Sequence, residues 1–257
     1  MKNIEVKILN PDVIAESEKM MVCAARLTQR GHQINNMDDF LALYDQSYTQ
    51  KTVKNMSQLP HPTIQKFSTI NAAIVGASRR LLAQITRHQN EVKFMSASLQ
   101  YSDYSDDAAF VVPYEIMEQP ALVKTMYLNS CKQAMQDYKA AIELGVDHDA
   151  AGYLMPHGLR NILIMSATPY QLKHMIGQRV CRRNTKETRY VMLRIWEALQ
   201  ATGSHMFAPT TTGAFCARDK CQEGGFCCGK PIPTSFTPDM IIEQDFPLMV
   251  KDAMSCG

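Results

Sequence analysis

Residues 67–88 read FSTINAAIVGASRRLLAQITRH, and the pattern of apolar residues changes within them. Residues 67–75 are rich in β-branched and apolar side chains, which predicts a strand that ends at Gly76. After Ser78, a favourable N-cap residue, the apolar residues recur with the period of a helix. They are Leu81, Leu82 and Ile85. We therefore expect a strand that is followed directly by a helix.

Strands and helices alternate on both sides of this segment. The predicted elements are a strand over 3–9, a helix through Val22, Ala25 and Leu27, a helix over 37–44, a loop over 46–62, a strand over 93–101, and long helices over 120–144 and 169–199. No internal repeat or linker divides the chain. This order predicts one mixed α/β or α+β domain.

The composition is that of a globular protein with little net charge. Of 257 residues, 46% are hydrophobic and 20% charged, and 27 basic against 25 acidic residues give a net charge of +2. This balance argues against nucleic acid or a membrane surface as a partner, because no bulk field attracts them. The N-terminus lacks the pattern of a secretory signal, and no stretch approaches 18 uninterrupted apolar residues. We expect a cytoplasmic protein.

Two sets of polar residues stand on predicted helices. Gln84, Arg87 and His88 are spaced i, i+3 and i+4 and share one helix face, where they either bind a ligand or form a solvated basic helix end. Arg179 continues an apolar stripe on the helix predicted over 169–199, so it needs either an internal partner or the oxygens of a ligand. Arg183 and Glu187 are interpreted as an ordinary surface pair.

Four of the eight cysteines lie within residues 216–228. In a reducing compartment such a cluster more often binds metal or takes part in redox chemistry than forms structural disulfides. Adjacent cysteines rarely both bind one tetrahedral ion, so Cys181 is an alternative fourth ligand. The other interpretation is a set of free thiols. Scattered elsewhere are Cys23, Cys131 and Cys256.

Several blocks together resemble the flavin-dependent thymidylate synthases. The central ones are Arg87-His88-Gln89 and residues 98–102, SLQYS, which are similar to the family's Arg-His-Arg and Ser-x-Arg-Tyr-Ser. Further similar blocks are Ala24-Ala25-Arg26, His61-Pro62, residues 151–156, residues 179–189 and the cysteine-rich tail. The resemblance implies an α+β domain with a central, mostly antiparallel sheet flanked by long helices. It also divides the chain into a synthase-like domain over 1–210 and a cysteine-rich extension over 211–257 packed on it.

The resemblance implies an enzyme of nucleotide biosynthesis, a homotetramer with FAD between subunits. NADPH would reduce the flavin, and methylenetetrahydrofolate would supply a one-carbon unit to C5 of a pyrimidine nucleoside monophosphate, with dUMP the default and UMP or a cytosine nucleotide as other options. The implied cofactor-binding residues are His61, Arg87, His88, Gln89 and His174. The implied substrate-binding residues are Gln84, Ser96, Ser98, Gln100 and Arg179, and Arg179 is also the implied catalytic residue.

The resemblance also bears on the cysteines. It aligns Cys216, Cys221 and Cys228 with cysteines of one clade of the family and leaves Cys227 extra. With Cys181 they are expected to bind one zinc ion or, as the second option, an iron–sulfur cluster.

This sequence departs from the family pattern at three arginines. Gln89 replaces the last arginine of Arg-His-Arg, Gln100 stands where the family has arginine, and Gly152 stands where another arginine helps to hold the nucleotide phosphate. Lost charge-assisted hydrogen bonds weaken such a grip by roughly 1.5–3 kcal/mol each. A second hypothesis is therefore a diverged member that serves as a nucleotide-binding or assembly subunit without its own activity.

Overall fold

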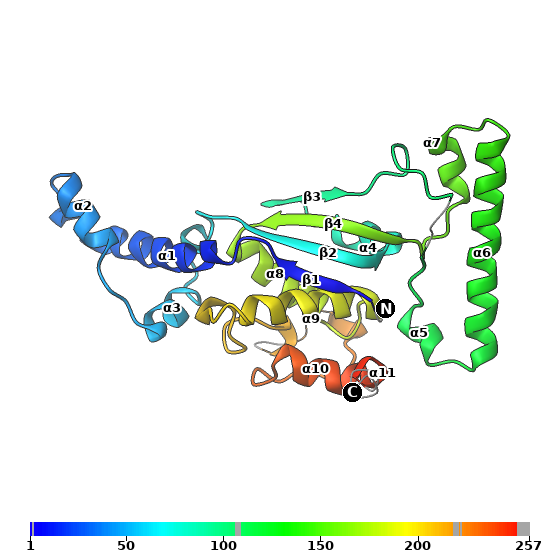
Figure 1. The fold of residues 1–257 in the computed structure, drawn as a ribbon. Coiled ribbons are helices and arrows are strands. Elements are labelled where there is room, and N and C mark those ends of the chain that lie inside the picture. Colours follow the sequence, from blue (N-terminus) through cyan, green and yellow to red (C-terminus); the bar gives the residue numbers. More distant parts are fainter. Residues whose placement is uncertain (2, 106–108, 218–220, 222, 251–257) are drawn as a thin grey trace, which may run out of the picture.

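The computed structural model describes residues 1, 3–105, 109–217, 221 and 223–250, and these fold around one antiparallel sheet (Figure 1). The strands are β1 (Glu5–Ile8), β2 (Ile70–Ser78), β3 (Val92–Ser96) and β4 (Arg160–Ala167). Their order is β1-β2-β4-β3, and each neighbouring pair is antiparallel. The expected α+β class with a central antiparallel sheet is confirmed.

Helices surround the sheet at its ends and on one face. They are α1 (Asp12–Arg30), α2 (Met37–Tyr44), α3 (Gln50–Met56), α4 (Arg79–Ile85), α5 (Tyr114–Met117), α6 (Ala121–Glu143), α7 (His148–Ala151), α8 (Pro169–Arg179), α9 (Lys186–Gln200), α10 (Pro238–Asp245) and α11 (Pro247–Val250). Short 3-10 turns are η1 (Gly31–Gln33), η2 (Pro62–Gln65), η3 (Gly152–Leu154), η4 (His205–Phe207), η5 (Phe215–Ala217) and η6 (Gly224–Phe226). In Figure 1, α8 and α9 lie beneath the sheet, and α6 stands apart at one end.

The core lies between the sheet and α9. Alternate residues of β2 are buried against the helices, and most of α9 is buried as well. The indole of Trp196 is fully buried, and its Nε1 donates a hydrogen bond of 2.8 Å to the carbonyl of Phe207. Ile232, Ile241 and Phe246 from the C-terminal part pack into the same core.

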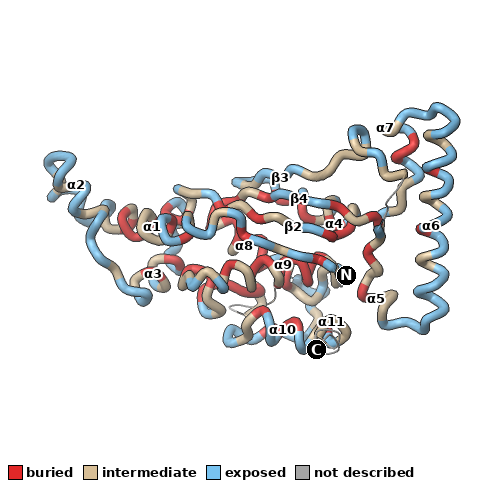
Figure 2. The backbone as a smooth tube through the Cα atoms, in the orientation of Figure 1, coloured by how far each residue is buried: buried red, intermediate tan, exposed pale blue. Residues whose placement is uncertain are grey.

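The opposite face of the sheet is uncovered (Figure 2). Its two central strands present apolar side chains there, and Val75 lies opposite Ile162 in the register. Ile164 pairs in the same way with Met95, which is 72% exposed. Burial of such a patch against another surface is favourable in water.

Local sequence patterns predicted some elements and missed others. The helix over 37–44 is confirmed as α2, and Ser78 caps α4 by accepting a hydrogen bond from Leu81 N. The loop over 46–62 is wrong in part, because a capping box at Thr49 starts α3. β4 was not predicted, and the strand predicted over 93–101 ends at Ser96. The strand predicted to end at Gly76 continues as β2 to Ser78 across a bulge.

Residues 169–199 form two helices, which corrects the single helix predicted there. α8 ends at Arg179 and α9 begins at Lys186. The side-chain amide of Asn184 donates 2.8 Å to the carbonyl of Gln178 in the last turn of α8. An asparagine bonded to the backbone in this way competes with helical hydrogen bonds, which accounts for the break.

Asp245 joins the C-terminal helices to α9. At the end of α10 its carboxylate accepts hydrogen bonds from Arg182, with Nε at 3.0 Å, and from Arg189, whose residue is 4% exposed. Burial alone raises the pKa of Asp245, but the hydrogen bonds from the two guanidinium groups outweigh it and hold this pKa below the ordinary value. The carboxylate of Asp245 and the guanidinium groups of Arg182 and Arg189 therefore each stabilise the charged form of the other.

Replacement of Asp245 by asparagine should lower the free energy of unfolding by about 3–5 kcal/mol at pH 7, because Arg189 remains buried without its counter-charge. The contribution of Asp245 is present above the unfolded pKa of 3.8 and is lost as pH falls through the lower folded value, so the two proteins should converge in acid. Urea unfolding at several pH values measures this. Glu243→Gln, at an exposed position on the same helix, is the control. A decrease in the free energy of unfolding of less than about 1 kcal/mol, which is the contribution of exposed ion pairs, would contradict the prediction.

Candidate functional site

Arg179, the last residue of α8, donates hydrogen bonds to three separate groups. Its Nε donates to Nε2 of His88 at 2.8 Å, and its Nη2 donates to the carbonyl of Gln84 at 2.9 Å. Its Nη1 donates to the side chain of Asn184 at 3.3 Å. The structure thus brings Gln84, His88 and Arg179 together, although Gln84 takes part through its backbone. α4 ends at Ile85, so His88 lies in the following turn and not on the predicted helix face.

His88 is neutral at physiological pH. Burial lowers its pKa from 6.5 to about 4, and the charge of Arg179 and the ring of His174 contribute further. Because Nε2 accepts from Arg179, the hydrogen-bond pattern assigns the ring proton to Nδ1. Burial also lowers the pKa of Arg179, and exposed Arg87 adds to the effect, but a guanidinium stays charged at neutral pH. The site therefore holds one fixed cation beside an uncharged imidazole.

A large cavity opens on the other side of His174. The rings of His88 and His174 meet edge to face with centroids 6.4 Å apart. The cavity has a volume of about 570 Å³, and its walls include Tyr170, Lys173 and His174 of α8. Lys173 Nζ donates to the carbonyl of Ser57 at 2.6 Å and to the Gln65 side chain at 3.1 Å. Aromatic rings beside a cation suit a flat, anionic ligand.

A smaller cavity of about 200 Å³ lies next to Arg179 and Asn184. Phe215 lines both cavities, and its ring packs directly on Gly177 of α8. A Cβ at position 177 would lie 2.3 Å from this ring, so the absence of a side chain there permits the contact. The cysteine-bearing segment is positioned against α8 in this way.

The other predicted residues have different contacts. In the described part of the chain, the side chains of Ser96, Ser98 and Gln100 make no hydrogen bond to Arg179, His88 or Gln84. Instead, Oγ of Ser98 accepts the backbone N–H of Gln100 at 3.1 Å. His61 is exposed at the N-cap of η2, and Gln89 is exposed as well. The hydrogen bonds among the described residues therefore do not join these two sets of predicted residues.

A family model described as "Thymidylate synthase complementing protein" matches residues 12–202. The chain belongs to this family. A relative named flavin-dependent thymidylate synthase, from Geobacter sulfurreducens, is 26% identical over 217 residues, which cover 84% of this chain and 90% of that protein. The family predicted from the sequence is therefore confirmed.

Two solved structures share the fold of this family member. Thymidylate synthase X from Helicobacter pylori, solved with FAD and dUMP, has a TM-score of 0.59 at 15% identity, covering 79% of this chain and 97% of that one. A UMP/dUMP methylase, PolB from Streptomyces cacaoi, solved with 5-Br dUMP, has a TM-score of 0.64 at 15% identity, covering 80% and 94%. At this identity they establish the fold alone.

In this family member the tail cysteines approach Arg179. Burial is the main cause that raises the pKa of Cys181, and the thiols of Cys216 and Cys228 act in the same direction. Cys227 was set aside in the sequence interpretation, but its sulfur accepts a hydrogen bond from the backbone N–H of Gly229 at 3.4 Å, and this N–H and the neighbouring Cys221 lower the pKa of its thiol. Among the described residues no group of three or more His, Cys, Asp and Glu side chains is arranged to hold a metal ion. The metal site stays a prediction, and Cys256 lies outside the described residues.

Sequence reasoning missed three residues that shape the site. Asn184 accepts a hydrogen bond from Arg179, and Lys173 donates to the carbonyl of Ser57 and to the side chain of Gln65. Glu187 is not a surface partner of Arg183, since its carboxylate accepts hydrogen bonds from both N, at 2.7 Å, and Oγ, at 2.5 Å, of Ser78. The polar Asn184-Thr185 pair before an apolar helix was the available signal for the break, whereas contacts between distant segments left no local signal.

Replacement of His88 by glutamine should make the protein less sensitive to acid. Between pH 6.5 and about 4 the unfolded chain binds a proton that folded His88 does not, so wild-type stability falls as pH drops through this window. Glutamine keeps an acceptor for Arg179 without titrating, and the loss on acidification should shrink by up to about 3 kcal/mol. Urea unfolding at pH 7 and 4.5 measures it, with exposed His32→Gln as control. Equal losses in wild type and H88Q would refute the assignment.

Proposed function

We propose that this protein is a flavin-dependent enzyme that transfers a one-carbon unit from methylenetetrahydrofolate to C5 of a pyrimidine nucleoside monophosphate in the cytoplasm, with NADPH as reductant. The observation that carries the proposal is the cationic Arg179 held beside neutral His88 between two cavities. Membership of the thymidylate synthase complementing family and a relative named as a flavin-dependent synthase support it. Within the described residues, no helix is long and apolar enough to cross a membrane.

The residues around His174 fit a flavin. Tyr170 and His174 offer ring surfaces for a flat heterocycle, and Lys173 offers a cation for phosphate. His61, Arg87, His88 and Gln89 are proposed to complete the flavin contacts. When bound, FAD supplies hydride chemistry that amino-acid side chains lack.

Arg179 is proposed to orient the pyrimidine and polarise its carbonyl. The hydrogen bonds of Arg179 to His88 and Gln84 fix the guanidinium before substrate arrives, so little reorganisation is needed when charge develops on the carbonyl oxygen. Polarisation of this kind makes C5 of the ring more nucleophilic. Neutral His88 favours this role because a second cation next to Arg179 would repel it.

Ser96, Ser98 and Gln100 are proposed to bind the nucleotide with a different phosphate grip. The side chain of Leu99 lies 3.4 Å from the position that a Cβ would take at Gly152, so Gln100 and Gly152 belong to neighbouring segments. Both positions lack the arginine expected from the resemblance. The loss of these cations affects dUMP, UMP and dCMP alike, because all three carry the same 5′-phosphate, so all three belong in the assay.

A homotetramer with shared active sites is proposed, as the resemblance to the family implies. The uncovered apolar face of the sheet, with Val75, Met95, Ile162 and Ile164, offers a surface for subunit contact. The exposed apolar residues of α6, Leu122 and Met126, offer a second one.

Arg179→Lys should reduce release of tritium from 5-labelled dUMP, UMP or dCMP by about 10²–10³-fold in kcat, because lysine keeps the charge but loses the fixed fork of donors. Purified protein should bind FAD and absorb near 450 nm in both forms. The control is Arg183→Lys, at an exposed neighbouring position, which should keep full activity.

Failure of the wild-type protein to take up FAD, or to release tritium from any of the three nucleotides, would overturn the proposal. Stabilisation by nucleotide without FAD binding, together with co-purification of an active synthase, would support the alternative of a nucleotide-binding or assembly subunit. The replaced arginine positions at Gln100 and Gly152 favour that second candidate.

Mixing two inactive variants should restore activity if the site is shared between subunits. Arg179→Ala removes one half and Ser98→Ala the other, so up to about a quarter of the sites in a randomly mixed assembly carry both intact halves. The measurement is tritium release after co-refolding, with each variant refolded alone as control. No gain in the mixture would place both halves in one chain and contradict the shared site.

We propose that Cys181, Cys216, Cys221 and Cys228 bind one zinc ion. An iron–sulfur cluster is the second option. The proximity of the Cys181 thiol to those of Cys216 and Cys228 supports the zinc site, and thiolates are preferred zinc ligands. Anaerobically purified protein should contain one zinc per chain, reduced in Cys181→Ser and unchanged in Cys23→Ser. Elemental analysis below about 0.2 metal per wild-type chain would refute the site.

A further inference from the structure

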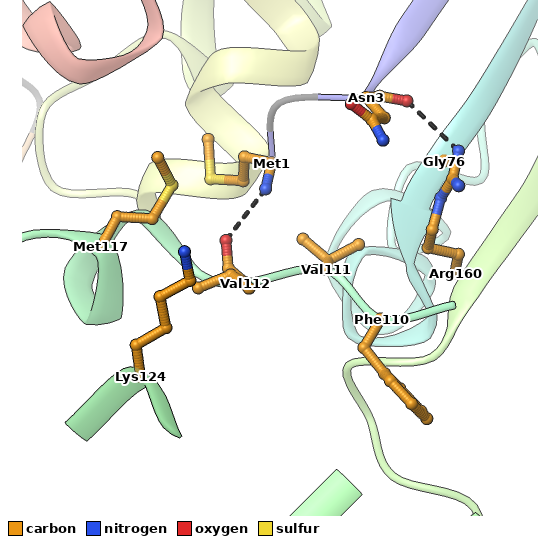
Figure 3. A pocket seen from close by; sticks show the side chains of 9 residues that line it. All are labelled: Met1, Asn3, Gly76, Phe110, Val111, Val112, Met117, Lys124 and Arg160. Carbon is orange, nitrogen blue, oxygen red and sulfur yellow. Dashed lines mark hydrogen bonds between the residues drawn. The ribbon is translucent and has the colours of Figure 1, made fainter. Parts of the chain in front are cut away.

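The arginines of this chain differ in how their guanidinium groups are held. In the cavity of Figure 3, Nη2 of Arg160 makes one long hydrogen bond of 3.4 Å to the carbonyl of Asn3, and Nε of Arg160 has no partner. Arg182 is bound more fully, because its Nε and Nη2 donate to the carboxylate of Asp245 at 3.0 and 3.1 Å. Arg160 is therefore loosely held, whereas the charge of Arg182 is offset by an ion pair.

Arg179 is held firmly and keeps its charge. Each of its three nitrogens donates to one acceptor, namely the ring of His88, the carbonyl of Gln84 and the side chain of Asn184. All three acceptors are uncharged. Among the described residues no carboxylate is bonded to Arg179, although Glu223 lines the cavity beside it. A guanidinium that neutral partners orient in this way retains its full charge for a ligand.

The carboxamide of Asn184 is itself fixed by the end of α8. Its Nδ2 donates to the carbonyl of Gln178 at 2.8 Å and to that of Cys181 at 3.4 Å, and its backbone N–H donates to the Cys181 carbonyl at 3.0 Å. Acceptors on one side and a donor on the other allow one orientation of the amide, with Oδ1 facing Nη1 of Arg179 at 3.3 Å. The acceptor is therefore in place before a ligand arrives.

The turn that carries Asn184 is anchored by other side chains as well. Arg182 donates to the carbonyl of Lys230 at 2.9 Å. Arg189 of α9 donates through Nε to the carbonyl of Val180, at the start of the turn, at 3.1 Å. Removal of the Asn184 side chain should thus leave the path of the backbone in place, so its effect on the guanidinium can be measured separately.

We propose that Asn184 is a positioning residue for the reaction, an inference that rests on the proposed function of Arg179. A guanidinium has five N–H groups, and the three contacts of Arg179 leave one on Nη1 and one on Nη2. Oδ1 of Asn184 holds the group so that these two N–H groups meet the carbonyl oxygen of the pyrimidine. Because the amide is neutral, it does not offset the charge that polarises this oxygen.

Asn184→Ala should lower kcat for tritium release about tenfold, the effect of one lost hydrogen bond to a charged group. KM for the nucleotide should change less than about threefold, because the orientation of the guanidinium matters most when charge develops on the carbonyl. Asn55→Ala, at an exposed position on α3, is the matched control and should keep wild-type values. Thermal unfolding followed by circular dichroism shows whether both variants are folded.

Asn184→Asp separates orientation from charge. Aspartate has nearly the same shape and still accepts from Nη1, so the guanidinium stays held. However, kcat should fall by at least about tenfold, because the ion pair offsets the charge of Arg179. This variant also tests the inference if Asn184→Ala does not fold.

A second measurement is independent of turnover. In protein labelled with ¹⁵N-arginine, NMR follows the exchange between Nη1 and Nη2 of Arg179, which requires rotation about the Nε–Cζ bond. Exchange should be about tenfold faster in Asn184→Ala, because one hydrogen bond that opposes this rotation is lost. It should stay as slow as in wild type in Asn184→Asp and in Asn55→Ala.

Unchanged kcat in either Asn184 variant, with an active wild type, would overturn the inference and leave the proposed function standing. Unchanged exchange in Asn184→Ala would also overturn it, because Asn184 would then not orient the guanidinium. An inactive wild type would overturn the proposed function and with it the role in the reaction, whereas the exchange rates would still show whether Asn184 orients Arg179.

Discussion

The guanidinium of Arg179 is a half-buried charge, and the surrounding backbone is arranged to satisfy it. Three acceptors come from two places in the chain: the carbonyl of Gln84 in the last turn of α4 and His88 just after that helix, and Asn184 after α8. A charge in such a position is tolerated only when its donors are paired. The end of α4, the end of α8 and the turn between α8 and α9 therefore have to stay in register with one another, and the two neighbouring cavities depend on that register.

Features determined by local sequence were predictable. The helix over 37–44 and the cap at Ser78 depend on residues three or four positions apart, and the stripe on α8 correctly indicated that Arg179 points inward. The helix break at 180–185 depends on a local hydrogen bond from the Asn184 side chain to the backbone, which the periodicity of apolar residues does not register. The role of Glu187 depends on a contact with Ser78, far away in the chain. The sequence could not show that Gln84 contacts Arg179 through its backbone carbonyl, because every residue has such a carbonyl.

The fold is shared with proteins of very different sequence. TM-scores of 0.59 and 0.64 at 15% identity show that the scaffold tolerates extensive replacement. Core positions such as Trp196 need shape and burial, which many sequences supply. Phosphate contacts need specific charges, and the neighbouring segments of Gln100 and Gly152 carry no arginine at these two positions. The proposed substrate is therefore better judged from the proposed contact residues than from overall similarity.

The uncovered face of the sheet has a consequence for how the protein behaves in solution. Its central strands are apolar there, whereas the outer strands β1 and β3 place Glu5, Lys7 and Lys93 in the same rows. Charged residues along the edges oppose the sideways addition of further strands, so association is directed face to face and not into a growing ribbon. In the proposed assembly, burial of this face would shift the folding equilibrium by mass action, so thermal stability would rise with protein concentration.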